Sequence, residues 1–266
     1  MSEVTSTDPT ILEQAINEVN EKPTVKIETV APSNSEVALP GGFINREGAL
    51  VKYAEVRELT GVDEEAIAKA GSSSKALLVM LQRGLVSIGT EPAERQDLDN
   101  LLSGDRDSIL IGIRKITFGD HVDFNLTCPY CKTNLDVSVD LNEDIPYREL
   151  EDPIEGRYFE YESKTHGIIK VALPKGATQR KLMENTDKTL AELNTLLLAG
   201  CVISVNGLAS MGATTVLKLG MADREKIVSE IVKRNPGPRL GEVTTSCEAC
   251  GEEIGMPLAL TDLFRL

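Results

Sequence analysis

Four cysteines form two pairs with C-x-x-C spacing, and this spacing suits two kinds of chemistry. The pairs are Cys128 with Cys131 and Cys247 with Cys250. Two thiolates in one tight turn can bind the same metal ion, and two such turns complete a tetrahedral shell of four sulfurs. A single pair can instead perform thiol–disulfide exchange, typically at the N-terminus of a helix that follows a strand. Here a β-like run follows each pair, so the sequence predicts one zinc ion held between two zinc-ribbon knuckles.

The separation of the two pairs indicates a structural role for this metal. Most of the second half of the chain lies between Cys131 and Cys247, so the site is discontinuous and closes a very long loop. Four protein ligands leave no open position for water or substrate, so the zinc is not expected to be catalytic. Four reduced, metal-free thiols are the alternative. The fifth cysteine, Cys201, lies in an apolar run and is predicted to be a small core residue.

The other residues capable of chemistry form no catalytic motif, so we expect a protein that is not an enzyme. The only histidines are His121, before an alternating strand, and His166, in a turn. The chain has no G-x-x-x-x-G-K-[ST], G-x-G-x-x-G or G-x-S-x-G motif. Asp105-Arg106 and Asp223-Arg224 stand at predicted helix starts. There we expect the aspartates to cap free N–H groups and the arginines to bridge to a neighbouring strand or loop.

Composition narrows the classes of partner. The 266 residues are 41% hydrophobic and carry a formal net charge of -14, which repels phosphate backbones and anionic lipids. We therefore expect neither nucleic-acid nor membrane binding. The N-terminus lacks a basic region followed by an apolar stretch, and no apolar window is long enough to span a bilayer. These features predict a cytosolic protein without a signal peptide.

Matching landmarks in one order predict an α+β fold of two duplicated α/β halves joined by the discontinuous zinc ribbon. The landmarks are Leu39-Pro40 with Leu173-Pro174, Asp105-Arg106 with Asp223-Arg224, and the two cysteine pairs. Their offset is 134 residues at the Leu-Pro motif and 118 residues at the Asp-Arg motif. This difference predicts roughly sixteen extra residues in the first half, around Val51 to Ser74. The predicted organisation is a tail over residues 1–21, a first repeat over 22–148 and a second over 149–266.

The spacing of hydrophobic residues predicts the helices and strands of each repeat. Helices are predicted over Ala76–Arg83 and Arg180–Ala199, each stopped by the glycine at position 84 or 200. Later helices carry apolar faces that consist of Ile109, Leu110, Ile113 and Ile116 in one repeat and of Ile227, Val228, Ile231 and Val232 in the other. A hairpin is predicted before each Leu-Pro motif, including Thr24–Val30 in the first repeat. The Leu-Pro-Gly-Gly segment itself is predicted to be a turn after a strand.

An amphipathic segment lies near the N-terminus. Asp8-Pro9 resembles a helix start, and Ile11, Ile16 and Val19 belong to a narrow apolar stripe. One interpretation is a short helix packed on the body of the protein, or a frayed tail. The other is a docking helix for a partner.

Several short motifs are shared with proteins of contractile phage tails. They are Leu39-Pro40-Gly41-Gly42, Val56-Arg57-Glu58-Leu59-Thr60-Gly61 with Asp63-Glu64-Glu65, Leu101-Leu102-Ser103-Gly104-Asp105-Arg106, Ile113-Arg114, Thr117-Phe118-Gly119 and the Cys128 pair. In these motifs the chain resembles the T-even-type baseplate hub and hub-assembly family.

The resemblance implies a structural or assembly protein with other baseplate, hub or tail proteins as partners. It implies a location in the virion tail baseplate, or in the host cytoplasm during assembly. Two alternatives remain open: a cellular zinc-ribbon protein of transcription or translation, and a tail-assembly chaperone that is absent from the mature virion.

Overall fold

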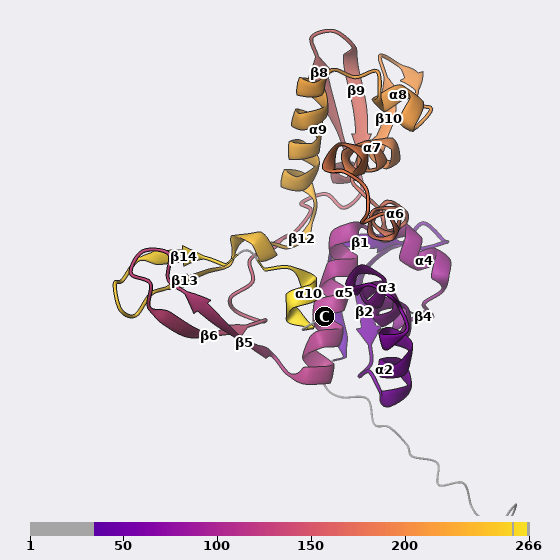
Figure 1. Ribbon diagram of the computed structural model, residues 1–266. Coiled ribbons are helices and arrows are strands. Elements are labelled where there is room, and N and C mark those ends of the chain that lie inside the picture. Colours follow the sequence, from indigo (N-terminus) through magenta and orange to yellow (C-terminus); the bar gives the residue numbers. More distant parts are fainter. Residues whose placement is uncertain (1–34, 257, 265–266) are drawn as a thin grey trace, which may run out of the picture. The chain divides into compact units, whose positions relative to one another are not determined.

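The computed structural model describes residues 35–256 and 258–264, which form an α+β fold (Figure 1). Its first sheet is antiparallel, with the strand order β1-β2-β3-β4. The strands are β1 (Glu36–Ile44), β2 (Leu50–Val56), β3 (Leu85–Ile88) and β4 (Glu91–Pro92). The accompanying helices are α2 (Gly61–Ala68), α3 (Ser73–Gly84), α4 (Arg95–Asn100) and α5 (Ser103–Phe118).

Helix α3 begins where the sequence provides a cap. The hydroxyl of Ser72 accepts a hydrogen bond from the N–H of Lys75, and the helix ends at the predicted Gly84. Its buried side chains, including Leu77 and Leu81, join the core between the first sheet and α5. The predicted helix over Ala76–Arg83 is thus confirmed, with an earlier start.

The second sheet is also antiparallel, with the strand order β8-β9-β10-β11. Its strands are β8 (Tyr158–Ser163), β9 (Gly167–Ala172), β10 (Val202–Val205) and β11 (Leu208–Ala209). Its helices are α6 (Gly176–Glu184), α7 (Leu190–Cys201), α8 (Ala213–Val216) and α9 (Met221–Arg234). Ile227 and Ile231 of α9 are buried in a second core as predicted, whereas Val232 is exposed.

Three two-stranded ribbons complete the fold. They are β5 (His121–Thr127) with β6 (Asn134–Asp140), β13 (Thr244–Ser246) with β14 (Glu253–Gly255), and β7 (Tyr147–Arg148) with β12 (Gly237–Pro238). Three short helices lie beside them: η1 (Glu155–Arg157), η2 (Leu240–Glu242) and α10 (Leu260–Leu263). A third core joins Val122 of β5, Met256 after β14 and Leu263 of α10 to Ile111 of α5. None of the helices in the described part of the chain is long and apolar enough to cross a membrane.

The two sheets and their helices follow the same element order. In each, two strands, two helices, two strands and two helices precede a cysteine turn flanked by strands, with the short β12 as an addition in the second. Matching by this order pairs β2 with β9. The offset then rises only from 116 to 119 residues, for the pairs Val56 and Ala172, Gly84 and Cys201, Asp105 and Asp223, and Cys128 and Cys247. The predicted insertion around Val51–Ser74 is therefore wrong, because these residues form β2, α2 and the start of α3.

The Leu-Pro motifs do not occupy matching places. Leu39–Gly42 lie inside β1, where the register with β2 shifts between Ala38 and Phe43. Leu173 and Pro174 instead follow β9. The first motif is an irregularity within a strand and not the predicted turn after one.

The helix predicted over Arg180–Ala199 is two helices. Helix α6 ends at Glu184 and α7 begins at Leu190. Thr189 and Glu192 cap each other reciprocally, because the Thr189 hydroxyl accepts from the Glu192 N–H and the Glu192 carboxylate accepts from the Thr189 N–H. The chain can therefore restart a helix directly after a turn. The N-terminal segment around Ile11–Val19 and the predicted strand Thr24–Val30 lie outside the described residues.

Buried polar side chains of α5 connect the first sheet to a helix of the second. Asp105 accepts a 2.7 Å hydrogen bond from the N–H of Gly41 in β1, and Arg106 donates a 2.6 Å bond to the carbonyl of Gly176 in α6. Arg106 therefore bridges to another element, although this element is a helix and not the predicted strand or loop. The predicted helix-capping role of Asp105 is wrong, because its carboxylate binds a strand.

The same correction applies to the second Asp-Arg pair. Asp223 accepts hydrogen bonds from the hydroxyls of Tyr161 and Ser163 on β8, at 3.0 and 2.6 Å. Arg224 bridges from α9 to α7, where it donates to Thr195. The two aspartates thus each bind the first strand of their own sheet, β1 or β8.

The carboxyl group of Asp105 is buried with an incomplete set of partners. Its Oδ2 accepts no hydrogen bond from any described residue, and burial raises its pKa from 3.8 to about 7. The folded state therefore holds a proton that the unfolded chain releases between about pH 4 and pH 7. Stability from this group falls as the pH rises through that interval.

We predict that the free energy of unfolding of Asp105→Asn, measured relative to that of the wild type, increases by roughly 2–4 kcal/mol as the pH rises from 4 to 8. The amide oxygen of Asn can still accept from Gly41, while the buried charge is absent. Urea denaturation at several pH values measures the difference between the two proteins.

Asp63→Asn is the control of opposite sign. Asp63 is buried, and hydrogen bonds from the Arg57 guanidinium hold its pKa well below the usual range. This variant should lose stability by a nearly constant amount from pH 5 to pH 8. An Asp105→Asn difference that does not change with pH would contradict the buried-charge interpretation.

Candidate metal centre

The first cysteine turn lies between β5 and β6. The N–H of Cys128 donates to the carbonyl of Thr133 at 2.9 Å, and the N–H of Lys132 donates to the carbonyl of Cys128 at 3.0 Å. Lys132 adopts a φ of +64°, a left-handed conformation that turns the chain back into β6. The turn therefore directs the thiols of Cys128 and Cys131 to one side.

The second turn lies between β13 and β14 and repeats this geometry. The N–H of Cys247 donates to the carbonyl of Glu252 at 2.9 Å, and the N–H of Gly251 donates to the carbonyl of Cys247 at 2.7 Å. Gly251 has a φ of +76° at the position that corresponds to Lys132. Both turns thus satisfy their backbone groups in the same way, although the residues between the cysteines differ.

The structure brings the four predicted cysteines together. All four Sγ atoms lie within 4.8 Å of one another. The Sγ atoms of Cys128 and Cys250 are 3.8 Å apart, and those of Cys131 and Cys247 are 3.6 Å apart. Each turn supplies one buried thiol, from Cys128 or Cys247, and one exposed thiol, from Cys131 or Cys250. This arrangement could hold one metal ion.

Ionisation differs between the two exposed thiols. The hydroxyl and backbone of Thr133 stabilise the Cys131 thiolate and lower its pKa to about 6. The backbone of Glu252 has the same effect on Cys250, but desolvation and the neighbouring cysteines outweigh it and raise its pKa to about 12. Crowded sulfurs therefore resist ionising together in the absence of a cation. A divalent metal would remove this conflict by replacing the protons.

Packing fixes the ribbons that carry the turns. Cys128 and Cys247 form a small buried cluster with Ile254 and Leu135. Arg114 of α5 donates from Nε to the carbonyl of Leu263 at 2.7 Å and from Nη2 to the carbonyl of His121 at 3.1 Å. One buried guanidinium thus joins α10 and the start of β5 to the central helix. The sequence indicated no such role for Arg114, because an arginine late in a helix usually faces solvent.

The remaining candidate residues fall elsewhere. Cys201 is buried in the second core, and burial raises its pKa to about 12, so it is the predicted core residue. His121 is exposed at the start of β5.

His166 lies near a serine and an aspartate, but the geometry differs from that of a catalytic triad. Its Nδ1 is 2.7 Å from Oγ1 of Thr165, 3.5 Å from Oγ of Ser163 and 3.6 Å from Oδ2 of Asp223. A triad uses one imidazole nitrogen for serine and the other for aspartate. Here one nitrogen faces both, and Ser163 donates directly to Asp223. The cluster ties the β8–β9 turn to α9.

A family model described as "T4 bacteriophage base plate protein" matches residues 51–264. The matched region includes all four clustered cysteines and both sheets except β1. No curated protein and no solved structure matched this chain significantly.

We predict that Cys128→Ser and Cys247→Ser each abolish tight metal binding and destabilise the protein by several kcal/mol, because either change leaves a shell of three sulfurs. Elemental analysis of protein purified under reducing conditions, with thermal melts, measures both effects. The matched control is Cys201→Ser, which should keep the metal. Equal metal content in all three variants would contradict the assignment of the four clustered cysteines as the metal ligands.

Proposed function

Because the chain belongs to this family of T4-type phage baseplate proteins, we propose that it is a non-enzymatic structural or assembly protein of the baseplate hub. The family match over residues 51–264 is the observation that carries the proposal. The virion tail is accordingly its proposed location, and other baseplate or tail proteins are its proposed partners. Two observations support the absence of catalysis. One nitrogen of His166 faces both Ser163 and Asp223, unlike in a catalytic triad, and four cysteine ligands would leave a metal no open position for substrate.

The metal in this proposal is one structural zinc ion. A tetrahedral zinc with Zn–S bonds of about 2.3 Å places its sulfurs about 3.8 Å apart. The Cys131–Cys247 and Cys128–Cys250 sulfur separations, 3.6 and 3.8 Å, agree with that edge length. Zinc is favoured because four thiolates in two ribbon turns are its usual structural ligands. Cys128, Cys131, Cys247 and Cys250 would hold it as a discontinuous zinc ribbon.

We further propose that the chain is an internal duplication, with repeats over residues 22–148 and 149–266. Equal element order, the nearly constant offset and the two aspartates that each bind the first strand of their own sheet support it. In this interpretation the zinc joins equivalent turns of the two repeats.

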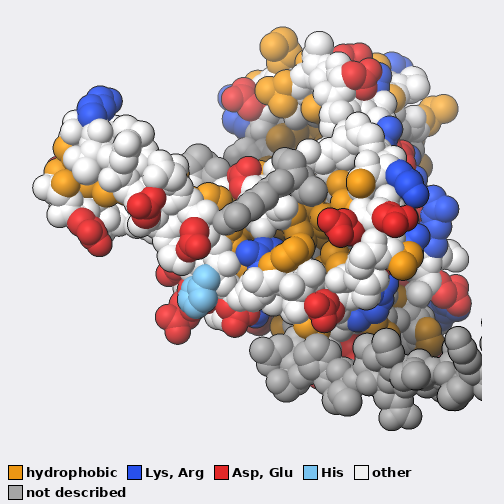
Figure 2. All heavy atoms as spheres, turned by 60° about the horizontal axis from the view of Figure 1, so that its bottom comes forward, with side chains coloured by type: hydrophobic (Ala, Val, Ile, Leu, Met, Phe, Trp, Pro, Cys, Tyr) orange, Lys and Arg blue, Asp and Glu red, His pale blue; other side chains and the backbone are white. Residues whose placement is uncertain are grey.

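The acidic composition suits protein partners better than DNA, since a net charge of -14 offers no counterion release on a phosphate backbone. On the face shown in Figure 2, acidic side chains are scattered among exposed hydrophobic ones. The sequence pattern of residues 1–21 makes that segment a further candidate for docking.

X-ray absorption at the zinc edge tests the metal. We predict one zinc per chain in protein purified without added metal, with four sulfur ligands at about 2.3 Å. A mixed sulfur and nitrogen shell, or another metal at full occupancy, would contradict the proposal.

Deleting the gene from its phage tests the function. We expect heads and partial tail structures but no complete, infectious tails, and a plasmid copy should restore them. Mass spectrometry of purified virions then separates a built-in subunit from a chaperone that leaves before maturation. Normal tails without the gene, or tight binding of the purified protein to duplex DNA at physiological salt, would favour the zinc-ribbon regulator instead.

A further inference from the structure

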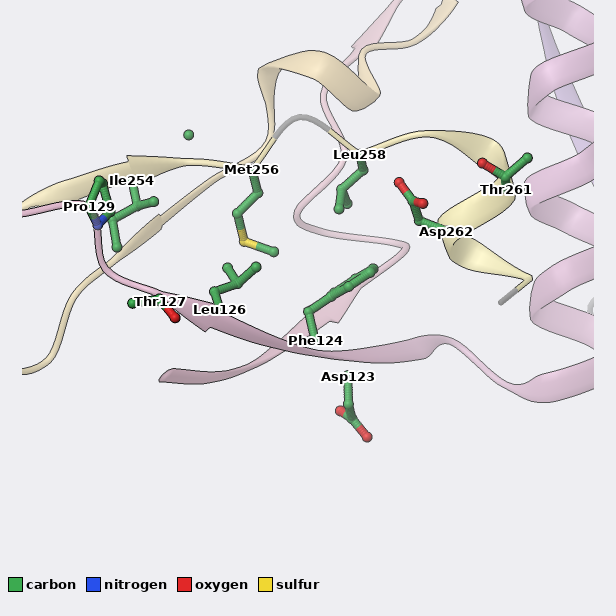
Figure 3. A pocket seen from close by; sticks show the side chains of 11 residues that line it. Asp123, Phe124, Leu126, Thr127, Pro129, Ile254, Met256, Leu258, Thr261 and Asp262 are labelled. Atoms are coloured by element: carbon green, nitrogen blue, oxygen red, sulfur yellow. The ribbon is translucent and has the colours of Figure 1, made fainter. Parts of the chain in front are cut away.

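An apolar slot of about 630 Å³ lies beside the cysteine cluster (Figure 3). Phe124 and Leu126 of β5 point into it from one wall, and Ile254, Met256 and Leu258 point into it from the other. The first cysteine turn bounds one end of the slot, and α10 bounds the other. The slot therefore depends on both ribbons and is not part of the metal centre itself.

The slot is open although its walls are apolar. Phe124, Leu126 and Leu258 are only partly buried, while Ile254 and Met256 are buried. Burying apolar surface is favourable roughly in proportion to the area removed from water. Side chains of the described residues leave the space unfilled, so an apolar occupant would gain free energy by entering it.

Strand β5 offers a way to hold such an occupant. Among the described strands it pairs only with β6, so its other edge has unpaired backbone groups. Asp123, Asn125 and Thr127 on its outer face are exposed. A segment added to the free edge would point alternate side chains to the same side as Phe124 and Leu126, which is the slot.

The charge of the residues that line the slot indicates which kind of segment would bind there. The described residues that line the slot include Asp123 and Asp262 and no lysine or arginine. The carboxylate of Asp262 is directed toward the slot, and one of its oxygens accepts from the N–H of Ala259 at 2.7 Å. Asp123 points away from the slot, on the outer side of β5. A basic side chain at the α10 end of the occupant would therefore meet negative charge.

We infer that the slot and the free edge of β5 bind an extended segment of another baseplate protein. This segment has apolar side chains at alternate positions and a lysine or arginine next to Asp262. The inference rests on the proposed function for the class of partner only. The apolar walls, the free edge and the acidic end specify the chemistry of the segment.

Photo-cross-linking in infected cells tests this inference. The full chain carries the substitution Thr261→p-benzoylphenylalanine at the α10 end of the slot and is expressed in cells infected by a phage that lacks the gene. After irradiation, the cross-linked adducts are mapped by mass spectrometry. The control is Thr244→p-benzoylphenylalanine. Thr245 is paired with Ile254 and shares its side of the ribbon, so the exposed Thr244 points to the opposite side.

We expect the Thr261 probe, and not the Thr244 probe, to capture one segment of another baseplate protein with the alternating apolar pattern and an adjacent basic residue. No adduct, an adduct only with a second copy of this chain, or a segment without that pattern would overturn the inference. Incomplete tails on gene deletion combined with any of these outcomes would leave the proposed function standing. Complete tails without the gene would refute that function separately.

Two variants check the contacts. Leu126→Lys places a charge in the slot and should lower the Thr261 adduct by about tenfold or more. Asn125→Lys is its matched control on the opposite face, where it lies beside Asp136, and should change the adduct less than about twofold.

Metal content shows whether each variant has folded. If Leu126→Lys loses the metal, Asp262→Asn takes its place, because it keeps an acceptor for Ala259 and removes only the charge. That variant should weaken capture more at low salt than at high salt. Unchanged capture in folded Leu126→Lys or in Asp262→Asn would contradict the proposed contacts.

Discussion

Burial of α5 on more than one side is the constraint on which the rest of the fold depends. Eleven of its sixteen residues are buried. Ile109, Leu110 and Ile113 belong to the core of the first sheet, whereas Ile111 belongs to the core of the cysteine ribbons. Leu102, directly before the helix, belongs to the core of the second sheet. The helix and the residue before it therefore contribute to three cores, so each part that packs there must leave space for the backbone of α5.

Close backbone approach shows how little room remains at the start of this helix. A Cβ on Gly104 would overlap the carbonyl of Pro236, and a Cβ on Gly176 would overlap the carbonyl of Leu98. Segments this close must satisfy one another's polar groups, which explains the buried partners of Asp105 and Arg106. Their unpaired atoms, Oδ2 and Nε, show that close packing has taken precedence over complete hydrogen bonding.

Local patterns allowed part of this structure to be predicted. The cysteine turns follow from spacing and flanking alternation, and α3 follows from its periodicity and its glycine. The Leu-Pro comparison failed because a shared dipeptide does not require a shared place in the sheet, whereas strand pairing does. The break at Asn185–Lys188 was missed because the Thr189–Glu192 cap was not recognised before the second helix. Arg114 and Asp105 could not be identified as junction residues, since Leu263 and Gly41, to which they bind, lie far away in sequence and no local pattern marks the contacts.

The metal centre and the slot share their structural support, and this has an energetic consequence. The walls of the slot belong to ribbons whose turns meet at the four sulfurs, and Cys131 and Cys247 are 116 residues apart in sequence. Closing a loop of that length restricts the unfolded chain by about 5 kcal/mol in the entropy model of cross-links. It also fixes the distance between the walls near Pro129. A metal that holds the turns together therefore favours the same conformation that a segment in the slot requires. By linkage, whatever free energy the metal adds to binding of the segment, the segment adds to retention of the metal. A structural ion bound by the four cysteines would in this way influence assembly without touching a partner.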